Sequence, residues 1–289
     1  MKTKDWLAFI GLSLAWGSSF LWIKIAVQEI GPFMLVALRV LFGILGLVVA
    51  LIIARPSRPA DPKLWRNLLI LGLTNTAFPF VLISWAEQHI ASAVAAVLNS
   101  SVPLFTMVIA HFILTDDRMT RRRVVGLLIG FLGVVVLTVR DLSGGLQINL
   151  VAQGAMILAV LFYAGSSVFA RRNTQGASPV IQALVPLLSA DIFIWAMVPL
   201  VESPVHLPAL PITWIALLWL GLIGSCIAYL LYYYLIHAVG PTRATMVTYT
   251  FPVVGVALGV LFLHETLDLN LIGGAALIIG SLLIVNRAK

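Results

Sequence analysis

Charge is scarce in this sequence of 289 residues: Asp, Glu, Lys and Arg together make up 10%, whereas hydrophobic residues make up 61%. A soluble domain carries about 25% charged residues. The chain therefore has too little polar surface to cover a water-facing exterior, and its composition predicts an integral membrane protein.

Cysteine is almost absent, since Cys226 is the only one, which excludes an intrachain disulfide. Acidic residues are also few, 11 against 18 Lys and Arg, so the net charge is +7. The basic residues stand in short clusters between apolar runs, a pattern typical of membrane topology rather than of a phosphate-binding face. We expect no nucleic-acid partner.

Enzyme motifs are missing too. The sequence contains neither G-x-S-x-G nor H-E-x-x-H, nor a phosphate-cradling glycine loop joined to a lysine. The five histidines are scattered without ligand spacing, so we expect no metal site and no cofactor. These absences and the short loops disfavour a membrane-embedded enzyme or a receptor. The sequence also contains no ATP-hydrolysing domain, so any pumping would have to draw on a gradient or on exchange.

Ten apolar runs alternate with short polar segments, each about as long as the roughly 20-residue helix that crosses a bilayer core. We expect an all-α membrane protein with ten transmembrane helices, because spanning strands are only about 9–11 residues long and alternate in polarity. The first run follows a basic start, as in a signal peptide, but it is long enough to span and no small-residue cleavage site follows it. The runs are approximately 6–27, 33–54, 65–86, 91–113, 122–139, 149–171, 180–200, 211–236, 242–263 and 270–286.

Lys and Arg are distributed unevenly between the runs. If the N-terminus is cytoplasmic, fifteen of them lie in inner segments and only Arg140 lies in an outer one, while Lys24 and Arg39 lie within runs. Because basic residues stay on the cytoplasmic side, this bias predicts a multi-pass protein of the inner (plasma) membrane with both termini cytoplasmic.

An apolar hairpin occurs twice. In the first copy Pro103 is followed thirteen residues later by Asp116, and in the second Pro252 is followed thirteen residues later by Glu265. A weaker echo pairs Gly17-Ser18-Ser19 with Gly165-Ser166-Ser167. Two repeats of five helices must insert in opposite directions because five is odd. Inverted repeats are typical of secondary transporters, with the substrate site between the halves near the midplane. The predicted repeats are residues 1–143 and 144–289.

Three segments carry a resemblance to a known family. Ala15-Trp16-Gly17-Ser18-Ser19-Phe20 through Lys24, the hairpin end Leu261-Phe262-Leu263-His264-Glu265 and the run LIGGAALIIG resemble the ten-helix EamA-type exporters of the drug/metabolite transporter superfamily. The resemblance covers both halves and implies export of small organic metabolites, with amino acids leading, by alternating access. Asp116-Asp117 departs from the glutamate that is usual in that family's first half.

Polar and aromatic groups within the runs are the candidates for a substrate site, since lipid-facing polar groups are disfavoured. A polar triplet stands shortly before each of two prolines, Asn99-Ser100-Ser101 before Pro103 and Thr248-Tyr249-Thr250 before Pro252. Each proline frees backbone carbonyls one turn earlier. Each of these groups also has a purely structural explanation. Small polar residues can mediate helix–helix packing, Trp16 can pack over Gly17, and some tyrosines can belong to the aromatic belt at the membrane interface. The candidate substrate-binding residues are Trp16, Asn75, Phe78, Trp85, Asn99, Ser101, Tyr163, Ser166, Tyr229, Tyr232 and Tyr249.

Three charged residues inside runs are candidates for coupling or charge recognition. Lys24 and Arg39 either snorkel to the surface or face inward to attract an anionic group such as a carboxylate. Asp191 lies close to the predicted bilayer centre, so it faces protein or water, either as a coupling group or in a structural hydrogen bond. Glu265 and Asp268 precede the last run, and we expect them to cap that helix.

The preferred hypothesis is that the protein is an exporter. Its expected partners are a small-molecule substrate and the lipid bilayer, and the expected oligomeric state is a monomer or a homodimer. The alternative within transporters is an organic-cation or multidrug efflux carrier. Such a carrier needs a buried acid in its cavity, for which Asp191 or Glu87 would have to serve.

Overall fold

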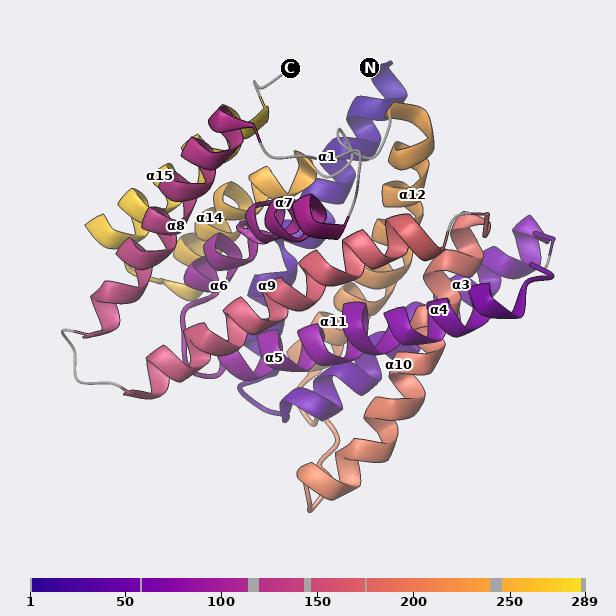
Figure 1. Cartoon of the computed structure of the whole chain (residues 1–289). Coiled ribbons are helices and arrows are strands. Elements are labelled where there is room, and N and C mark those ends of the chain that lie inside the picture. Colours follow the sequence, from indigo (N-terminus) through magenta and orange to yellow (C-terminus); the bar gives the residue numbers. More distant parts are fainter. Residues whose placement is uncertain are drawn as a thin grey trace.

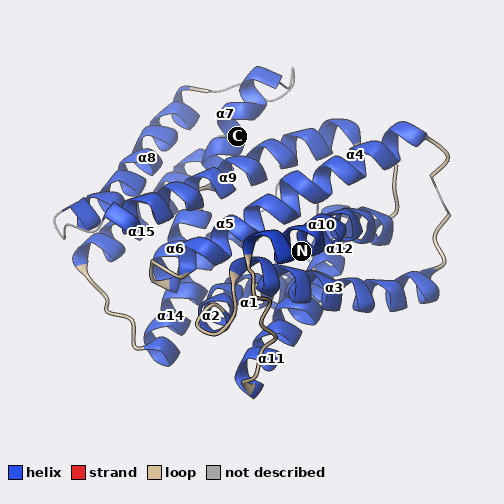
Figure 2. Cartoon of the chain, turned by 90° about the horizontal axis from the view of Figure 1, so that it is seen from below, coloured by secondary structure: helices blue, strands red, loops and turns tan. Residues whose placement is uncertain are grey.

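The computed structural model describes residues 2–57, 59–113, 120–142, 147–174, 176–239 and 246–286. Over these residues the chain consists of helices and connecting segments, without strands, as the sequence predicts (Figure 2). Several predicted features lie outside the described residues: Asp116 and Asp117, Arg243, the repeat boundary between 143 and 144, and residues 287–289.

The helices pack into one bundle (Figure 1). In chain order they are α1 (Thr3–Gly17), α2 (Ser19–Ala26), α3 (Pro32–Ala54), α4 (Pro62–Gly72), the π-helical η1 (Leu73–Ala77), α5 (Phe78–Glu87), α6 (Ser92–Asn99), α7 (Val102–Ile113), α8 (Arg121–Leu142), α9 (Gln147–Asn173), α10 (Pro179–Val201), α11 (Pro211–Leu218), the π-helical η2 (Trp219–Ile227), α12 (Ala228–Val239), the 3₁₀ turn η3 (Met246–Thr250), α14 (Phe251–Leu263) and α15 (Leu269–Asn286).

Seven helical stretches among the described residues are long and apolar enough to cross a membrane. They coincide with seven of the ten predicted runs, those from 6–27 to 91–113 and from 149–171 to 211–236. The other three runs also form helix, in α8, α14 and α15, and the apolar stretches of the last two, Val247–Leu263 and Leu269–Ser281, are shorter.

The outside of the bundle is apolar. Phe112, Ile53 and Ile192 expose 80%, 78% and 73% of their surface, respectively. So many large exposed hydrophobic side chains would drive association in water, but they match a lipid environment. The exterior therefore fits the membrane assignment made from composition.

Helix irregularities interrupt several of the long apolar runs. The predicted single helix over 6–27 is broken at Ser18, where α1 ends and α2 begins. The run over 91–113 is broken between Asn99 and Val102, and Pro103 stands in the first turn of the new helix, where its missing N–H costs nothing. Pro252 has the same place at the start of α14, after a 3₁₀ turn. The continuous helices expected over these two runs are therefore interrupted in front of the prolines, at Ser100 and Ser101 and in η3.

A long contact joins α8 and α15, which lie side by side at one flank of the bundle (Figure 1). Gly133 lets the backbones approach: a Cβ there would lie 2.9 Å from the carbonyl oxygen of Gly274 and 2.8 Å from the side chain of Ile278. Small residues at such contacts are the usual means by which membrane helices associate. The last helix of each predicted repeat thus packs against the other.

Candidate functional site

An aromatic cluster forms where α1, α12 and α14 meet. Trp16 lies at its centre, with ring centroids 5.3 Å from Tyr232, 5.9 Å from Tyr229 and 6.4 Å from Phe251. The indole Nε1 of Trp16 donates to the carbonyl oxygen of Gly224 at 3.0 Å, which fixes the ring. Three predicted site residues, Trp16, Tyr229 and Tyr232, are therefore brought together, and Phe251 joins them although the sequence did not single it out.

Arg39 is buried beside this cluster, with 4% of its surface exposed. Its guanidinium lies 4.0 Å over the ring of Phe80, and its Nε donates to Ser225 Oγ at 3.3 Å. Tyr163 and Tyr229 are close enough to interact with it electrostatically. Among the described residues, no carboxylate hydrogen bonds to this guanidinium. Glu87 acts on Arg39 electrostatically, but its carboxyl oxygens make no hydrogen bond among the described residues. A buried cation without a hydrogen-bonded carboxylate can receive an anionic group of a ligand.

The π-helical segment η2 places Ser225 against Arg39. The Ser225 hydroxyl donates to the carbonyl oxygen of Leu220, five residues earlier in η2, at 3.0 Å. A Cβ at Gly221 would lie 2.7 Å from the Arg39 carbonyl oxygen, so only glycine allows η2 to approach α3 this closely. Local backbone irregularity thus positions the partner of the buried cation.

The predicted polar candidates do not form one group. Ser166 donates to the Thr74 hydroxyl at 2.9 Å, next to the half-buried Asn75. Ser101 is fully buried, and its hydroxyl donates to the Leu98 carbonyl oxygen at 2.6 Å. It therefore satisfies a backbone carbonyl at the break between α6 and α7. Asn99 is buried with its side-chain oxygen lacking a partner among the described residues.

Three predicted aromatic candidates lie on other elements than the rings that contact Trp16: Phe78 and Trp85 on α5, and Tyr249 on η3. Phe78 exposes 36% of its surface and packs against Phe162 and Phe193, which places it on the outside of the bundle. Trp85 packs against His89 at the end of α5. Tyr249 is half-buried against the core in η3.

Lys24 does not snorkel to the surface. Its ammonium group donates hydrogen bonds to the carbonyl oxygens of Glu87 and Ile90, at 2.5 and 2.8 Å, and thereby caps the C-terminal end of α5. Lysine there satisfies carbonyls that the helix leaves unpaired. The carboxyl group of Glu87 is also close to Lys24, and Glu87 is fully buried.

Asp191 lies in α10 with 8% of its surface exposed, so it faces the protein as expected. One of its carboxyl oxygens is buried without a hydrogen-bond partner among the described residues.

Three glutamates hold helix N-termini that belong to other parts of the chain. The expectation that Glu265 caps the following helix is wrong: its oxygens accept from the backbone amides of Ser92 and Ala93, at 2.7 and 3.0 Å, so it caps α6. The sequence placed it near α15, but the fold brings it closer to another helix start. Asp268 does cap α15, through the Leu271 amide at 2.7 Å.

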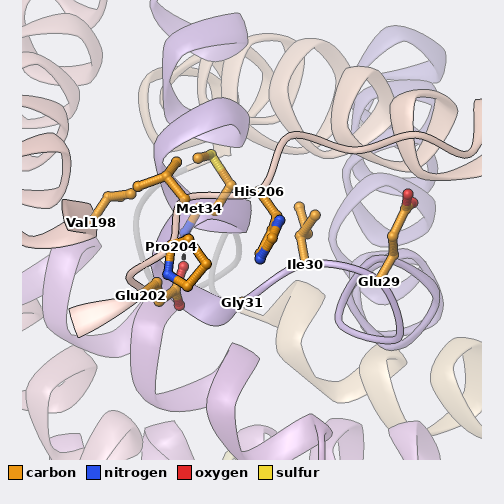
Figure 3. Close-up of a pocket in the computed structure, with 9 residues that line it drawn as sticks. Glu29, Ile30, Gly31, Met34, Val198, Glu202, Pro204 and His206 are labelled. Carbon is orange, nitrogen blue, oxygen red and sulfur yellow. Dashed lines mark hydrogen bonds between the residues drawn. The ribbon is translucent and has the colours of Figure 1, made fainter.

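Glu202 and Glu29 act in the same way. Glu202 accepts from the amides of Phe33 and Met34 at 2.7 and 2.9 Å, and Glu29 accepts from the amides of Ala209 and Leu210 at 2.5 and 2.9 Å. Figure 3 shows both glutamates around a small pocket, with Ile30 and His206 between them. This pocket contains none of the predicted substrate-binding residues.

Among the described residues no cluster of His, Cys, Asp and Glu could hold a metal ion.

Comparisons with known proteins give the family. The model of the EamA-like transporter family matches residues 4–139 and again residues 151–287. An uncharacterized inner membrane transporter of Escherichia coli, YedA, is 32% identical over 263 residues, which cover 90% of this chain and 83% of YedA.

Two further relatives and one solved structure span nearly the whole chain. An uncharacterized transporter of Archaeoglobus fulgidus is 26% identical over 99% of this chain and all of the relative. A protein of Salmonella typhimurium named as a probable amino-acid metabolite efflux pump is 25% identical over 98% of this chain and 95% of its own. One crystal structure, at 20% identity, superposes with a TM-score of 0.69 over 99% of this chain and 98% of the other, which supports the fold.

Proposed function

The chain belongs to the EamA-like transporter family, and we propose that it is a secondary transporter that exports small organic metabolites such as amino acids by alternating access. One relative named as a probable amino-acid metabolite efflux pump supports this choice of substrate. The name of another relative, an inner membrane transporter, supports the same membrane for this chain.

The proposed architecture is ten transmembrane helices in two inverted repeats, residues 1–143 and 144–289, with both termini cytoplasmic. The two separate family matches, 4–139 and 151–287, support two repeats of equal kind. The bias of Lys and Arg supports the orientation. The substrate site is then proposed to lie between the repeats, where α1 and α3 of the first repeat contact η2, α12 and α14 of the second.

The observation that carries the substrate class is the buried guanidinium of Arg39 beside the aromatic side chains of Trp16, Tyr163 and Tyr229. Arg39 is proposed to bind the carboxylate of the substrate by paired charge-assisted hydrogen bonds. The rings of Trp16 and the two tyrosines then contact its apolar part. A site with one cationic and one aromatic region suits an amino acid with a hydrophobic side chain.

The test is flux of labelled amino acids in proteoliposomes, with empty liposomes as the control. The panel includes aromatic, branched and small polar side chains, and the amide derivative of each transported amino acid, which lacks the carboxylate. Saturable flux of the acids that exceeds flux of the amides supports the proposal.

A second candidate function, export of organic cations, draws support from the unpartnered carboxyl groups of Asp191 and Glu87. Preferred flux of the amides or of a quaternary ammonium dye would favour that candidate and reject Arg39 as a carboxylate receptor.

A further inference from the structure

One face of α5 carries buried polar groups that lack partners. Ser84 Oγ and both carboxyl oxygens of Glu87 are buried and, within the part of the chain that the structure describes, have no hydrogen-bond partner. Both residues have 0% of their surface exposed. Three residues apart, they lie on the same face of the helix, and Phe80, one turn before Ser84, packs under Arg39. A polar face thus runs from the buried cation to the C-terminal end of α5.

Such an arrangement is unusual in a folded interior, where nearly all buried polar groups are hydrogen-bonded. An ionised carboxylate without hydrogen bonds is strongly disfavoured in an apolar surrounding, whereas its protonated form is neutral and far easier to bury. The conformation described here therefore matches a Glu87 carboxyl group that carries a proton.

The charged groups that act on Glu87 come from three other elements: Lys24 on α2, Arg39 on α3, and Glu265 between α14 and α15. Glu265 is held by the α6 amides, and Lys24 donates to the carbonyl oxygens of Glu87 and Ile90. His89, the nearest histidine in the chain, packs against Trp85. Lys24 therefore stands within reach of a Glu87 carboxylate but is bonded to the backbone instead. If Glu87 loses its proton, its carboxylate competes for the Lys24 ammonium group. The hydrogen bonds from Lys24 to the carbonyl oxygens of Glu87 and Ile90 then weaken.

We propose that Glu87 is the proton-binding residue that couples substrate export to the proton gradient. This rests on the proposed function as a transporter. In each cycle the carboxylate takes up one proton from the outer side and releases it to the cytoplasm, while the substrate moves outward. Only one O–H bond forms and breaks, and Lys24 alternates between the end of α5 and the carboxylate.

The experiment compares wild type with Glu87→Gln and with Asp191→Asn, a matched control at the other unpartnered acid. Each is reconstituted in proteoliposomes, and uptake of a labelled amino acid transported by the wild type is measured with and without a pH gradient. Exchange of internal for external amino acid is measured without a gradient. We expect Glu87→Gln to lose gradient-driven accumulation yet retain exchange, and Asp191→Asn to retain both. Gradient-driven accumulation in Glu87→Gln would overturn the proposal.

A second measurement does not depend on the substrate. Infrared difference spectra between acidic and alkaline pH contain a carbonyl stretching band for each carboxyl group that titrates. A buried carboxyl band that disappears in Glu87→Gln, but persists in Asp191→Asn, supports the assignment; a band unchanged by Glu87→Gln overturns it. If no amino acid is transported by the wild type, the proposed function fails, and the band still decides whether Glu87 binds a proton. Should Glu87→Gln not fold, Glu87→Asp is the substitute, and it must shift the pH dependence of flux.

Discussion

Glu29 and Glu202 each cap the helix that follows the other. Glu29 stands just before α3 and accepts hydrogen bonds at the start of α11, while Glu202 stands in the segment before α11 and accepts hydrogen bonds at the start of α3. The carboxylates compensate free amides and the positive end of each helix dipole. Two segments about 170 residues apart in the chain are thereby joined at one end of the bundle.

The first prediction concerns Glu202→Ala. Removing the carboxylate leaves the amides of Phe33 and Met34 without their acceptor, and loss of a helix cap costs about 1 kcal/mol. Hydrogen exchange at the start of α3 should accelerate, and the thermal transition in detergent should fall. Glu202→Gln keeps one acceptor oxygen and should lie between wild type and Glu202→Ala. Equal exchange in all three proteins would contradict this role.

The second prediction concerns acid pH. The hydroxyl of Thr213, with the amides of Ala209 and Leu210, lowers the pKa of Glu29 below its ordinary value, because these groups stabilise the ionised form. The stabilisation is therefore complete above the ordinary pKa of about 4.3, and it is lost as the pH falls through the lowered value. Amide exchange at the start of α11 should rise on acidification in that window, and Glu29→Gln should abolish the pH dependence.

The third prediction tests Arg39 as the carboxylate receptor. Arg39→Lys keeps the charge but lacks the planar fork that binds a carboxylate with two hydrogen bonds. A lost charge-assisted hydrogen bond of about 1.5–3 kcal/mol raises the KM for amino acids about tenfold or more. The measurement is concentration-dependent uptake in proteoliposomes, with circular dichroism as the folding control. An unchanged KM in Arg39→Lys would remove Arg39 from the site.

The fourth prediction separates the two glycines that the sequence pairs. A Cβ at Gly17 would lie 2.7 Å from the Cβ of Val254 in α14, whereas nothing lies within 4 Å of a Cβ at Gly165. Gly17→Ala should therefore lower the thermal transition in detergent, because α1 and α14 must move apart. Gly165→Ala lies within the continuous helix α9 and should be neutral or stabilising by up to about 1 kcal/mol. The reverse order of stabilities would contradict this packing.

The same two glycines show where sequence reasoning reaches its limit. The sequence Gly-Ser-Ser occurs in both places, but the two local structures differ. Helix α1 ends at Gly17, whereas helix α9 is uninterrupted at Gly165. The residues around a glycine decide whether it allows close packing, and those residues come from distant segments. An effect of Pro103 and Pro252 on the backbone before them was expected from the sequence, because proline acts on its own helix, but the interruption of both helices appears only in the structure.

Helix capping by acidic residues shows the same division between local and distant partners. Asp268 caps the helix that follows it, because its partner amide is only three residues away. Glu265 was expected to do the same, but it lies against α6, 173 residues from Ser92. Helix ends accept any nearby carboxylate, so only the packing of the bundle decides which one they receive.

Composition and the lengths of the apolar runs by themselves determined the membrane assignment, the helical class and the approximate positions of the helices, since these depend on burial of each segment in lipid. The tertiary structure decided which polar groups meet: Arg39 with Phe80 and Ser225, Trp16 with Tyr229 and Tyr232, and Lys24 with the end of α5. In an apolar interior a charge must find its partners among other helices, and no local pattern encodes which helix supplies them.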